Sequence, residues 1–291
     1  MRIFWLVIKL LFFNGRFEMS SLTQPPVDKV LVWSEEFLGV AGSSPSSQFW
    51  SVDIGDGSDR GLPGWGNEEL EYYLDSALTL TGSDEGGLCI TAQKQPASTS
   101  LMAYYGPAQY FSGKMHTDGK VGFKYGYIEV RAKMAPYGGT WPAIWLLGTD
   151  LKKGVSWPGC GEIDVMEGLG NEPTMIRGAL HARGHFGDDA VTKIEDAKSD
   201  LSEDFHTYGV LWLPGSFDWY FDGRHYLSAT KADPRSVAGG WPFDQEFFLI
   251  LNLAIGGKLG GEVDPALKSS QFCVDYIRHY SVGGFGEVFL H

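Results

Sequence analysis

Alternating apolar and polar residues predict strands through most of this chain. In residues 127–134 every second residue is apolar, namely Ile128, Val130, Ala132 and Met134. The residues between them are Tyr127, Glu129, Arg131 and Lys133. A period of two directs the first set toward a core and the second set to the opposite face of one strand.

Later segments extend this pattern. Residues 247–254 are almost continuously apolar and predict a buried strand, and residues 272–280 predict the strand that closes the domain. Asp222-Gly223 separates two aromatic-rich runs, which is a hairpin signal. Residues 190–200 are the one stretch whose pattern suggests a helix. We therefore expect an all-β fold.

The composition fits one large β domain. The chain has 291 residues with 39 Gly and 14 Pro, which suits many short strands joined by tight turns. Neither a repeat nor a linker divides the sequence. We expect a domain over residues 29–282, preceded by an extension at 1–28 and followed by a short tail at 283–291.

The candidate chemistry lies in residues 161–168, Gly-Glu-Ile-Asp-Val-Met-Glu-Gly. The β-branched residues in this run favour a strand, so Glu162 and Asp164 share one face. Strict alternation would put Glu167 on the other face. A β-bulge at residues 165–166 would return Glu167 to the side of the other two acids.

Three carboxyl groups on one strand face repel one another. If the face lines a cleft, their pKa values separate, so that one group stays ionised while another stays protonated. A carboxylate that acts as nucleophile and a carboxylic acid that protonates the leaving oxygen can together split a glycosidic bond. A solvated acidic strand edge and a metal-ligand cluster are the alternatives. The segments around the acids favour catalysis.

Charge and cysteine content narrow the class of partner. A net charge of −13 argues against nucleic acid or an anionic membrane and is compatible with a neutral polymer. The cysteines Cys89, Cys160 and Cys273 are too few for a disulfide framework or a zinc site. Cys160 lies two residues before Glu162, and a Cys89–Cys273 bridge is left open.

The N-terminus leaves the location open. Residues 1–13 are mostly apolar and fit a secretory signal or an anchor, although Lys9 interrupts the run and no small-residue cleavage site follows. This run is too short to span a bilayer. We expect an extracellular or periplasmic protein, or a cytoplasmic one if translation starts at Met19. Beyond such a segment we expect no membrane partner.

Several motifs together resemble glycoside hydrolase family 16. Residues 162–167 resemble its ExDxxE signature in the laminarinase-type form with the extra residue. Residues 157–161 (Trp-Pro-Gly-Cys-Gly), residues 178–181 (Gly-Ala-Leu-His) and the WGNxExxYY-like residues 65–73 also resemble that family. The resemblance runs from about Leu31 to Tyr280. It implies a β-jelly-roll sandwich of two antiparallel sheets, one of them concave and forming the substrate cleft.

The resemblance also implies an activity, which is retaining endo-hydrolysis of a β-1,3-glucan such as laminarin without a catalytic cofactor. Glu162 would attack the anomeric carbon, and Glu167 would act first as acid and then as base. Asp164 would hydrogen-bond to Glu162 and help keep Glu167 protonated. The carboxyls of Glu162 and Glu167 should then lie about 5–5.5 Å apart.

Six residues are expected to bind sugar: Trp65, Asn67, Arg131, Trp141, Trp145 and His181. Trp141 and Trp145 are an even number apart and would share a strand face, and flat aromatic rings suit the apolar faces of glucose. The resemblance places the other four along the groove or near the acids. For each residue alone, an ordinary role in the core, a turn or the surface is the alternative.

One departure from the family pattern is Leu259, which stands where laminarinase-like members often carry a tryptophan. This change removes an aromatic platform, at the end of the cleft opposite Trp65. Glu36, the carbonyl of Gly86 and Asp275 match the family's structural calcium positions. Ordinary surface carboxylates are the alternative for Glu36 and Asp275.

Two other functions remain open. The first is a mixed-linkage β-1,3-1,4-glucanase, which the five-residue spacing of the glutamates disfavours. The second is a non-catalytic β-glucan-binding protein, which both retained glutamates disfavour. In every case the partner would be a β-glucan polysaccharide, and we expect a monomer.

Overall fold

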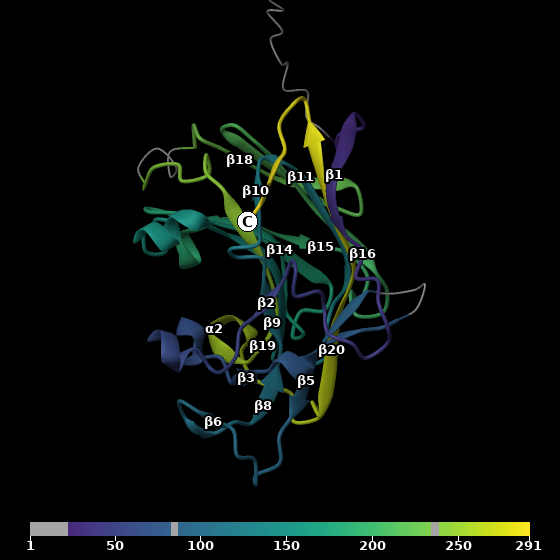
Figure 1. Ribbon diagram of the computed structural model, residues 1–291, viewed down its shortest axis with the longest axis vertical. Coiled ribbons are helices and arrows are strands. Elements are labelled where there is room, and N and C mark those ends of the chain that lie inside the picture. Colours follow the sequence, from purple (N-terminus) through teal and green to yellow (C-terminus); the bar gives the residue numbers. More distant parts are fainter. Residues whose placement is uncertain (1–22, 83–86, 234–238) are drawn as a thin grey trace, which may run out of the picture.

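Figure 1 shows two broad layers of strands, with loops and short helical turns at their ends. The structure is a computed structural model and describes residues 23–82, 87–233 and 239–291. Its strands form a ten-stranded sheet, a nine-stranded sheet and one small two-stranded sheet, β6 (Met102–Ala103) with β7 (Gly106–Pro107). The predicted all-β sandwich is confirmed.

The ten-stranded sheet has the spatial order β18-β17-β16-β11-β20-β5-β8-β3, with β1 added to β20 and β4 added to β5. All of its pairs are antiparallel except β3 with β8. Its strands are β1 (Lys29–Glu35), β3 (Glu71–Tyr73), β4 (Leu78–Leu80), β5 (Leu88–Lys94), β8 (Tyr110–Ser112), β11 (Gly126–Lys133), β16 (His206–Leu213), β17 (Ser216–Phe221), β18 (Arg224–Thr230) and β20 (Ser269–Val282).

The nine-stranded sheet has the order β15-β14-β13-β12-β19-β10-β21, with β9 added to β19 and β2 added to β9. Every pair in it is antiparallel. Its strands are β2 (Ser51–Val52), β9 (Lys114–His116), β10 (Val121–Lys124), β12 (Thr140–Gly148), β13 (Glu162–Gly168), β14 (Met175–His181), β15 (Val191–Asp196), β19 (Phe247–Ile255) and β21 (Glu287–Leu290).

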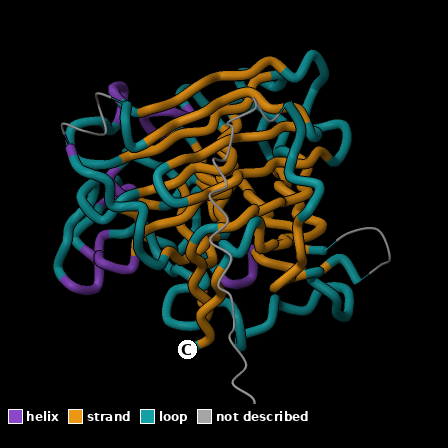
Figure 2. Tube along the Cα trace, turned by 90° about the horizontal axis from the view of Figure 1, so that it is seen from above, coloured by secondary structure: helices purple, strands orange, loops and turns teal. Residues whose placement is uncertain are grey.

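The apolar faces of the two large sheets pack together, and the strands run across the molecule between loops (Figure 2). Ile128 and Val130 of β11 are buried in this core, as the alternation predicts, and so are Ile163 and Val165 of β13. β19 is buried along its whole length, as predicted. Because the inner faces meet, the outer faces point in opposite directions and are separated by the thickness of the sandwich.

Short helical turns connect the strands at Ser58–Arg60, Pro63–Gly66, Asp75–Ala77, Thr149–Lys153, Gly187–Asp189 and α2 (Gly257–Gly260). The helix predicted for residues 190–200 is wrong, because β15 occupies residues 191–196. β15 pairs with β14 at the edge of the nine-stranded sheet, and this pairing outweighs the weak local pattern. Asp222 and Gly223 both have positive φ and form the predicted hairpin turn between β17 and β18.

The C-terminus and the cysteines complete the fold. Residues 283–291 are not a tail outside the domain, because β21 pairs with β10 and extends the nine-stranded sheet. Cys89 and Cys273 form a disulfide between β5 and β20, the bridge that the sequence left open, while Cys160 is free and buried.

The signal or anchor expected near the N-terminus falls mostly in residues 1–22, which lie outside the described residues. Among the residues that the structure describes, none of the helices has the length and apolar run needed to cross a bilayer.

Candidate active site

Strand β13 carries the three acids and is bulged where the sequence predicts. The register with β12 shifts between Ile144 and Trp145, and the register with β14 shifts between Asp164 and Glu167. Val165 and Met166 are both buried in the core. The strand therefore absorbs one extra residue and turns neither apolar side chain toward solvent.

The pairing shows that all three acids stand on one outer face. The residues opposite Glu162, Asp164 and Glu167 are Leu147, Trp145 and Ala143 on β12, and His181, Ala179 and Arg177 on β14. Both sets of partners are spaced by two, and residues paired directly across strands share a face. The bulge thus does what the sequence analysis expected.

A tryptophan side chain donates to each of the two glutamates. Trp157 Nε1 donates to Glu162 Oε2 over 2.8 Å, and Trp141 Nε1 donates to Glu167 Oε1 over 3.0 Å. An indole N–H is a neutral donor, so it orients a carboxyl group without cancelling the charge that the group carries. These contacts aim the two glutamates without neutralising them.

His181 stands beside the acids, where the sequence analysis expected it. Its Nε2 lies 3.1 Å from Oδ2 of Asp164 and 3.7 Å from Oε1 of Glu162. The backbone N–H of Gly187 donates to Nδ1 over 3.1 Å. The neutral ring therefore carries its proton on Nε2, facing the carboxyl row.

Asp164 is the most enclosed of the three acids, with 3% of its surface exposed. Trp219 reaches across the core from β17, and its Nε1 donates to the backbone carbonyl of Asp164 over 2.8 Å. This bond ties the residue just before the bulge to the opposite sheet.

Burial raises the pKa of all three carboxyls, and the charge of a neighbouring acid adds to the shift of Glu162 and of Asp164. Burial and then the charge of Asp164 raise the pKa of Glu162 to about 8. Burial and then the charge of Glu167 raise the pKa of Asp164 well above its ordinary value, and burial raises the pKa of Glu167. The three groups therefore do not all ionise near neutral pH. A proton on Asp164 removes the repulsion that opposes ionisation of Glu162.

Trp141 and Trp145 emerge on the same outer face, as their even spacing predicts, but they lean in different directions. Trp141 reaches toward β13 and the acids. Trp145 leans toward β19, where its Nε1 donates to Oδ1 of Asn252 over 2.8 Å. The ammonium of Lys114 lies 5.4 Å from the centre of the Trp145 ring and 3.9 Å from that of Trp65.

The loop with Trp65 and Asn67 docks on the end of β19 and on α2. The backbone N–H of Lys258 donates to the carbonyl of Asn67 over 2.8 Å, and Leu70 N–H donates to the carbonyl of Ile255. Leu259, in α2, therefore lies at the same end of the face as Asn67. The expectation that the two mark opposite ends is wrong.

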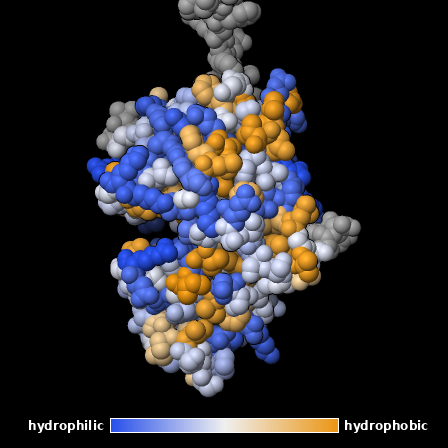
Figure 3. Space-filling model, in the orientation of Figure 1, coloured by the Kyte–Doolittle hydropathy of each residue, from blue (hydrophilic) through white to orange (hydrophobic). Residues whose placement is uncertain are grey.

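A hollow in the molecular surface borders this loop. Figure 3 shows a deep notch between an upper and a lower part of the molecule, with hydrophilic side chains on both sides. In the same orientation, the turns of residues 58–66 and α2 lie below this notch (Figure 1). The loop is thus placed to contact a ligand that enters the hollow.

Arg131 does not join this site. Its strand β11 lies in the ten-stranded sheet, and its Nη1 binds Oδ2 of Asp275 over 2.6 Å. Because Ile128 and Val130 of the same strand point into the core, Arg131 is on the outer face that points away from the acids. The prediction that its face lines the substrate cleft is wrong. Alternation separates the two faces of a strand but does not tell which sheet the strand joins.

The predicted calcium ligands lie on that other outer face, with Gly86 outside the described residues. Both carboxylates already have cationic partners: Arg278 donates two hydrogen bonds to Glu36, and Arg131 donates to Asp275. In this arrangement the two side chains do not fit a formed calcium site, since a cation would have to displace both arginines.

Among the described residues, the ligand atoms of Glu162, Asp164 and His181 lie within 4.8 Å of one another and could hold a metal ion. All three residues belong to the same outer face of β13 and β14.

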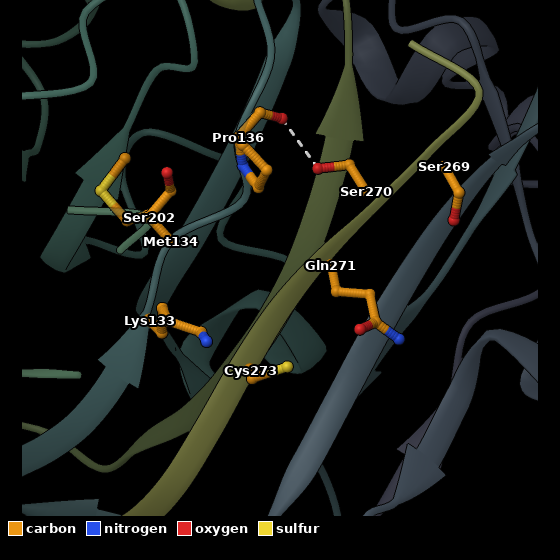
Figure 4. A pocket seen from close by; sticks show the side chains of 8 residues that line it. All are labelled: Lys133, Met134, Pro136, Ser202, Ser269, Ser270, Gln271 and Cys273. Atoms are coloured by element: carbon orange, nitrogen blue, oxygen red, sulfur yellow. Dashed lines mark hydrogen bonds between the residues drawn. The ribbon is translucent and has the colours of Figure 1, made fainter. Parts of the chain in front are cut away.

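A separate pocket of about 310 Å³ lies on strands β11 and β20, beside the disulfide (Figure 4). It is lined by Lys133, Met134, Pro136, Ser202, Ser269, Ser270, Gln271 and Cys273. None of the predicted site residues lines this pocket. Its strands belong to the ten-stranded sheet, which does not carry Glu162, Asp164 and Glu167.

Sequence reasoning missed four residues of the acid-bearing face: Trp157, Arg177, Lys114 and Asn252. A signal existed for two of them. Trp157 lies five residues before Glu162, and Asn252 is the one polar residue in the apolar strand β19. Lys114 and Arg177 reach the face only through strand pairing, which single-sequence patterns do not reveal.

Comparison with known proteins gives one consistent family. The model of glycosyl hydrolases family 16 matches residues 64–278. A β-glucanase from Rhodothermus marinus is 35% identical over 261 residues, which cover 86% of this chain and 84% of the relative.

Two solved structures are also similar. The laminarinase catalytic domain of Thermotoga maritima has a TM-score of 0.79 at 38% identity, over 88% of this chain and 99% of that one. The endo-β-1,3-glucanase of Pyrococcus furiosus has a TM-score of 0.80 at 36% identity, over 89% and 98%. With the family expected from its motifs thereby confirmed, this chain belongs to glycosyl hydrolases family 16.

Proposed function

We propose that this protein is an endo-β-1,3-glucanase that hydrolyses laminarin-like β-glucan with retention of configuration. The observation that carries the proposal is the bulge in β13, which puts Glu167 on the outer face with Glu162 and Asp164. The relatives described above, a laminarinase and an endo-β-1,3-glucanase among them, support the choice of β-1,3-glucan as substrate.

In the proposed reaction Glu162 is the nucleophile. Its carboxylate attacks the anomeric carbon while Glu167 protonates the leaving glycosidic oxygen, giving a covalent glycosyl-enzyme. Glu167, now ionised, then takes a proton from water, and that water releases the sugar from Glu162. Trp157 and Trp141 hold the two carboxyls in position for these steps.

Asp164 holds a proton in this scheme, so burial rather than the expected charge of Asp164 raises the pKa of Glu167. Its burial makes it the costliest of the three to ionise, and when protonated it can donate a hydrogen bond to Glu162. Glu162 can then ionise and attack. His181, with its proton on Nε2, lies 3.1 Å from Asp164 and 3.7 Å from Glu162, close enough to stabilise a negative charge on this pair.

A neutral glucan offers no charge to bind, so affinity must come from ring stacking and from hydrogen bonds to hydroxyl groups. Trp141 and Trp145 provide aromatic surface on the acid-bearing face. Trp65 and Asn67 come from the loop that borders the hollow. We assign no sugar contact to Arg131, because it lies on the other outer face.

Product analysis on laminarin, barley β-glucan, lichenan and agarose tests the substrate. We expect a series of short β-1,3-linked oligosaccharides from laminarin and the highest kcat/KM on that polymer. Higher kcat/KM on barley β-glucan would favour the mixed-linkage alternative. Binding to laminarin without release of reducing ends would favour a binding protein.

NMR of the first products tests the mechanism. Retention predicts that the β-anomer forms first and then mutarotates, and the initial appearance of α-anomer would refute the roles given to Glu162 and Glu167. The separation of their carboxyls, about 5–5.5 Å in a retaining enzyme, stays a prediction.

We further propose that the protein works outside the cytoplasm. The Cys89–Cys273 disulfide supports this location, because structural disulfides persist mainly in oxidising compartments. Thiol titration of protein from the native host, with and without prior reduction, tests it. Fully reduced Cys89 and Cys273 would argue for a cytoplasmic location.

Calcium also stays a proposal, with Glu36, Gly86 and Asp275 as ligands. A cation bound only by the folded state raises the melting temperature with its concentration. Because both carboxylates are already bound by arginines, we expect equal Tm values in millimolar calcium and in EDTA. A higher Tm in calcium that is lost in Glu36→Gln would instead support the calcium site.

A further inference from the structure

A second pair of buried carboxyls, which the proposed reaction does not use, lies beneath the loop with Trp65 and Asn67. Glu69 is 5% exposed and Glu71 is 0% exposed. Within the described residues neither one takes part in an ion pair. Two buried carboxyls without a cation are costly unless one of them is protonated.

The hydrogen bonds indicate where that proton lies. Glu69 accepts at both oxygens, from Asn67 Nδ2 over 3.0 Å and from the Tyr73 hydroxyl over 3.2 Å. Glu71 Oε2 accepts from the backbone N–H of Ile255 over 2.7 Å. The other oxygen of Glu71, Oε1, is buried and accepts no hydrogen bond from the described residues. A proton on that oxygen would make it a donor to Glu69.

The direction of the Tyr73 bond follows from its neighbours. Trp145 has only a donor, so Asn252 must accept through Oδ1, and its amide nitrogen then donates to the Tyr73 oxygen over 3.1 Å. The Tyr73 hydroxyl then donates its single proton to Oε2 of Glu69. Glu69 is therefore surrounded by donors, and the proton shared by the carboxyl pair belongs to Glu71.

We propose that Glu71 is a positioning residue, a buried carboxylic acid that donates a hydrogen bond to Glu69. Glu69 in turn accepts hydrogen bonds from Asn67 and from Tyr73. Tyr73 is connected through Asn252 to Trp145, so these bonds form one network. The network thus joins the loop to an aromatic side chain of the acid-bearing face. Its effect on sugar binding rests on the proposed glucan hydrolysis, but the protonation of Glu71 does not.

The surroundings of Glu71 favour its neutral form. Burial, and next the charge of Glu69, raise the pKa of Glu71 well above its ordinary value. The titratable groups near the pair come from the loop, β3, the β6–β7 hairpin, β8 and β9, and are Glu68, Tyr73, Tyr104, Tyr105, Tyr110, Asp56 and Lys114. Lys114 is the cation among them, and its close partner is Asp53 rather than Glu71.

Glu71→Gln tests the protonation directly, because glutamine imitates a protonated glutamate. Its amide can donate to Glu69 while its carbonyl accepts from Ile255. Glu68→Gln is the matched control, since Glu68 is an exposed acid of the same loop. Urea unfolding of the wild type and both variants would be measured from pH 5 to pH 9.

A raised folded-state pKa gives stability that is present at low pH and lost as pH rises toward that pKa. We expect the unfolding constant of the wild type to rise relative to that of Glu71→Gln by up to about tenfold per pH unit, the slope of one proton. Glu68→Gln should follow the wild type. Parallel curves for wild type and Glu71→Gln would overturn the proposal.

Infrared difference spectra provide a readout that does not depend on stability or activity. The wild type minus Glu71→Gln spectrum at neutral pH should contain the C=O band of a protonated carboxyl group. A carboxylate band in its place would overturn the proposal even if Glu71→Gln unfolds more easily.

Tyr73→Phe tests the positioning role, since it removes the hydroxyl through which Glu69 reaches Asn252. Losing one hydrogen bond should raise KM on laminarin by roughly 3- to 10-fold, with a smaller change in kcat. An unchanged KM in a folded variant would overturn the positioning role. If the wild type does not hydrolyse laminarin at all, the proposed function fails, while the unfolding and infrared results still decide whether Glu71 is protonated.

Discussion

The outer faces of the two sheets both carry acidic side chains, but the groups next to these acids differ between the two faces. On the ten-stranded sheet each of three carboxylates lies beside a cation: Glu129 with Lys29, Asp275 with Arg131 and Glu36 with Arg278. On the nine-stranded sheet, Glu162 and Glu167 accept hydrogen bonds from the neutral indoles of Trp157 and Trp141. Asp164 lies beside His181.

The pKa values of Glu36 and Glu162 move in opposite directions as a result. Hydrogen bonds from Arg278 lower the pKa of Glu36, whereas burial and the charge of Asp164 raise the pKa of Glu162 to about 8. Acids next to cations are ordinary surface groups of a folded protein. Acids that are crowded together and bonded to neutral donors destabilise the fold, and such an arrangement is typical of a site that performs chemistry.

The largest expected difference between the faces is in activity. Glu162→Gln should lower kcat/KM on laminarin by roughly 10³-fold or more, because it removes the proposed nucleophile. Glu129→Gln makes the same chemical change on the other face and should leave kcat/KM within about twofold of wild type.

Azide tests the role of Glu162 more specifically. In Glu162→Ala the small anion can occupy the space of the lost carboxylate and restore part of the turnover. Full activity in folded Glu162→Gln would instead place the nucleophile elsewhere.

Loss of the aromatic surface should have the next largest effect. Trp141→Ala and Trp145→Ala should each lower kcat/KM on laminarin at least about tenfold, or roughly 1.4 kcal/mol of transition-state binding. Trp141→Ala should also lower kcat, because its indole orients Glu167. Wild-type kinetics in both folded variants would show that the glucan binds elsewhere on the sheet.

The two faces should also differ in how stability depends on pH. Asp164 has a raised pKa, so what it contributes to the free energy of unfolding is lost as pH rises. Asp164→Asn should therefore gain stability relative to wild type above about pH 5. Glu36 has a lowered pKa, so its contribution is lost as pH falls, and Glu36→Gln should approach wild-type stability in acid. Urea unfolding from pH 3 to pH 9 would measure both trends, and equal trends would contradict the comparison.

The smallest effect is expected for Arg131→Ala. It removes an ion pair that is partly exposed to solvent, so the free energy of unfolding should fall by about 1 kcal/mol or less. kcat/KM on laminarin should stay within about twofold of wild type. A tenfold loss of kcat/KM would instead show that Arg131 contributes to substrate binding or catalysis.

The sequence pattern predicted the strands, the acid row and the bulge because each depends on local order, whereas the sandwich was implied by the resemblance to family 16. Alternation sets which residues share a strand face, and the spacing of Glu162 and Glu167 requires an extra residue between them. Placing Arg131 was a different problem, because it depends on which strands pair with β11, and residues far away in the chain decide that.

Short or polar strands were missed for a related reason. β21 has only four residues and β15 is largely polar, so neither shows a clear alternation of apolar and polar residues. Each is a strand because it pairs with a neighbouring strand. The network of Glu69, Glu71, Tyr73 and Asn252 includes a hydrogen bond between residues 179 positions apart. Only Asn252, polar within an apolar strand, indicated it in advance.

The bulge in β13 has a consequence for how this strand can evolve. The register with β14 is recovered by Gly168, which pairs with Ile176, so the extra residue disturbs the strand over only a few positions. Loss of one codon at residue 165 or 166 would leave the glutamates four residues apart, again on one face by plain alternation. The strand can therefore gain or lose a residue at this point without turning its acidic side chains inward. Such insertions and deletions offer a lineage a way to change the distance between its two glutamates in a single mutational step.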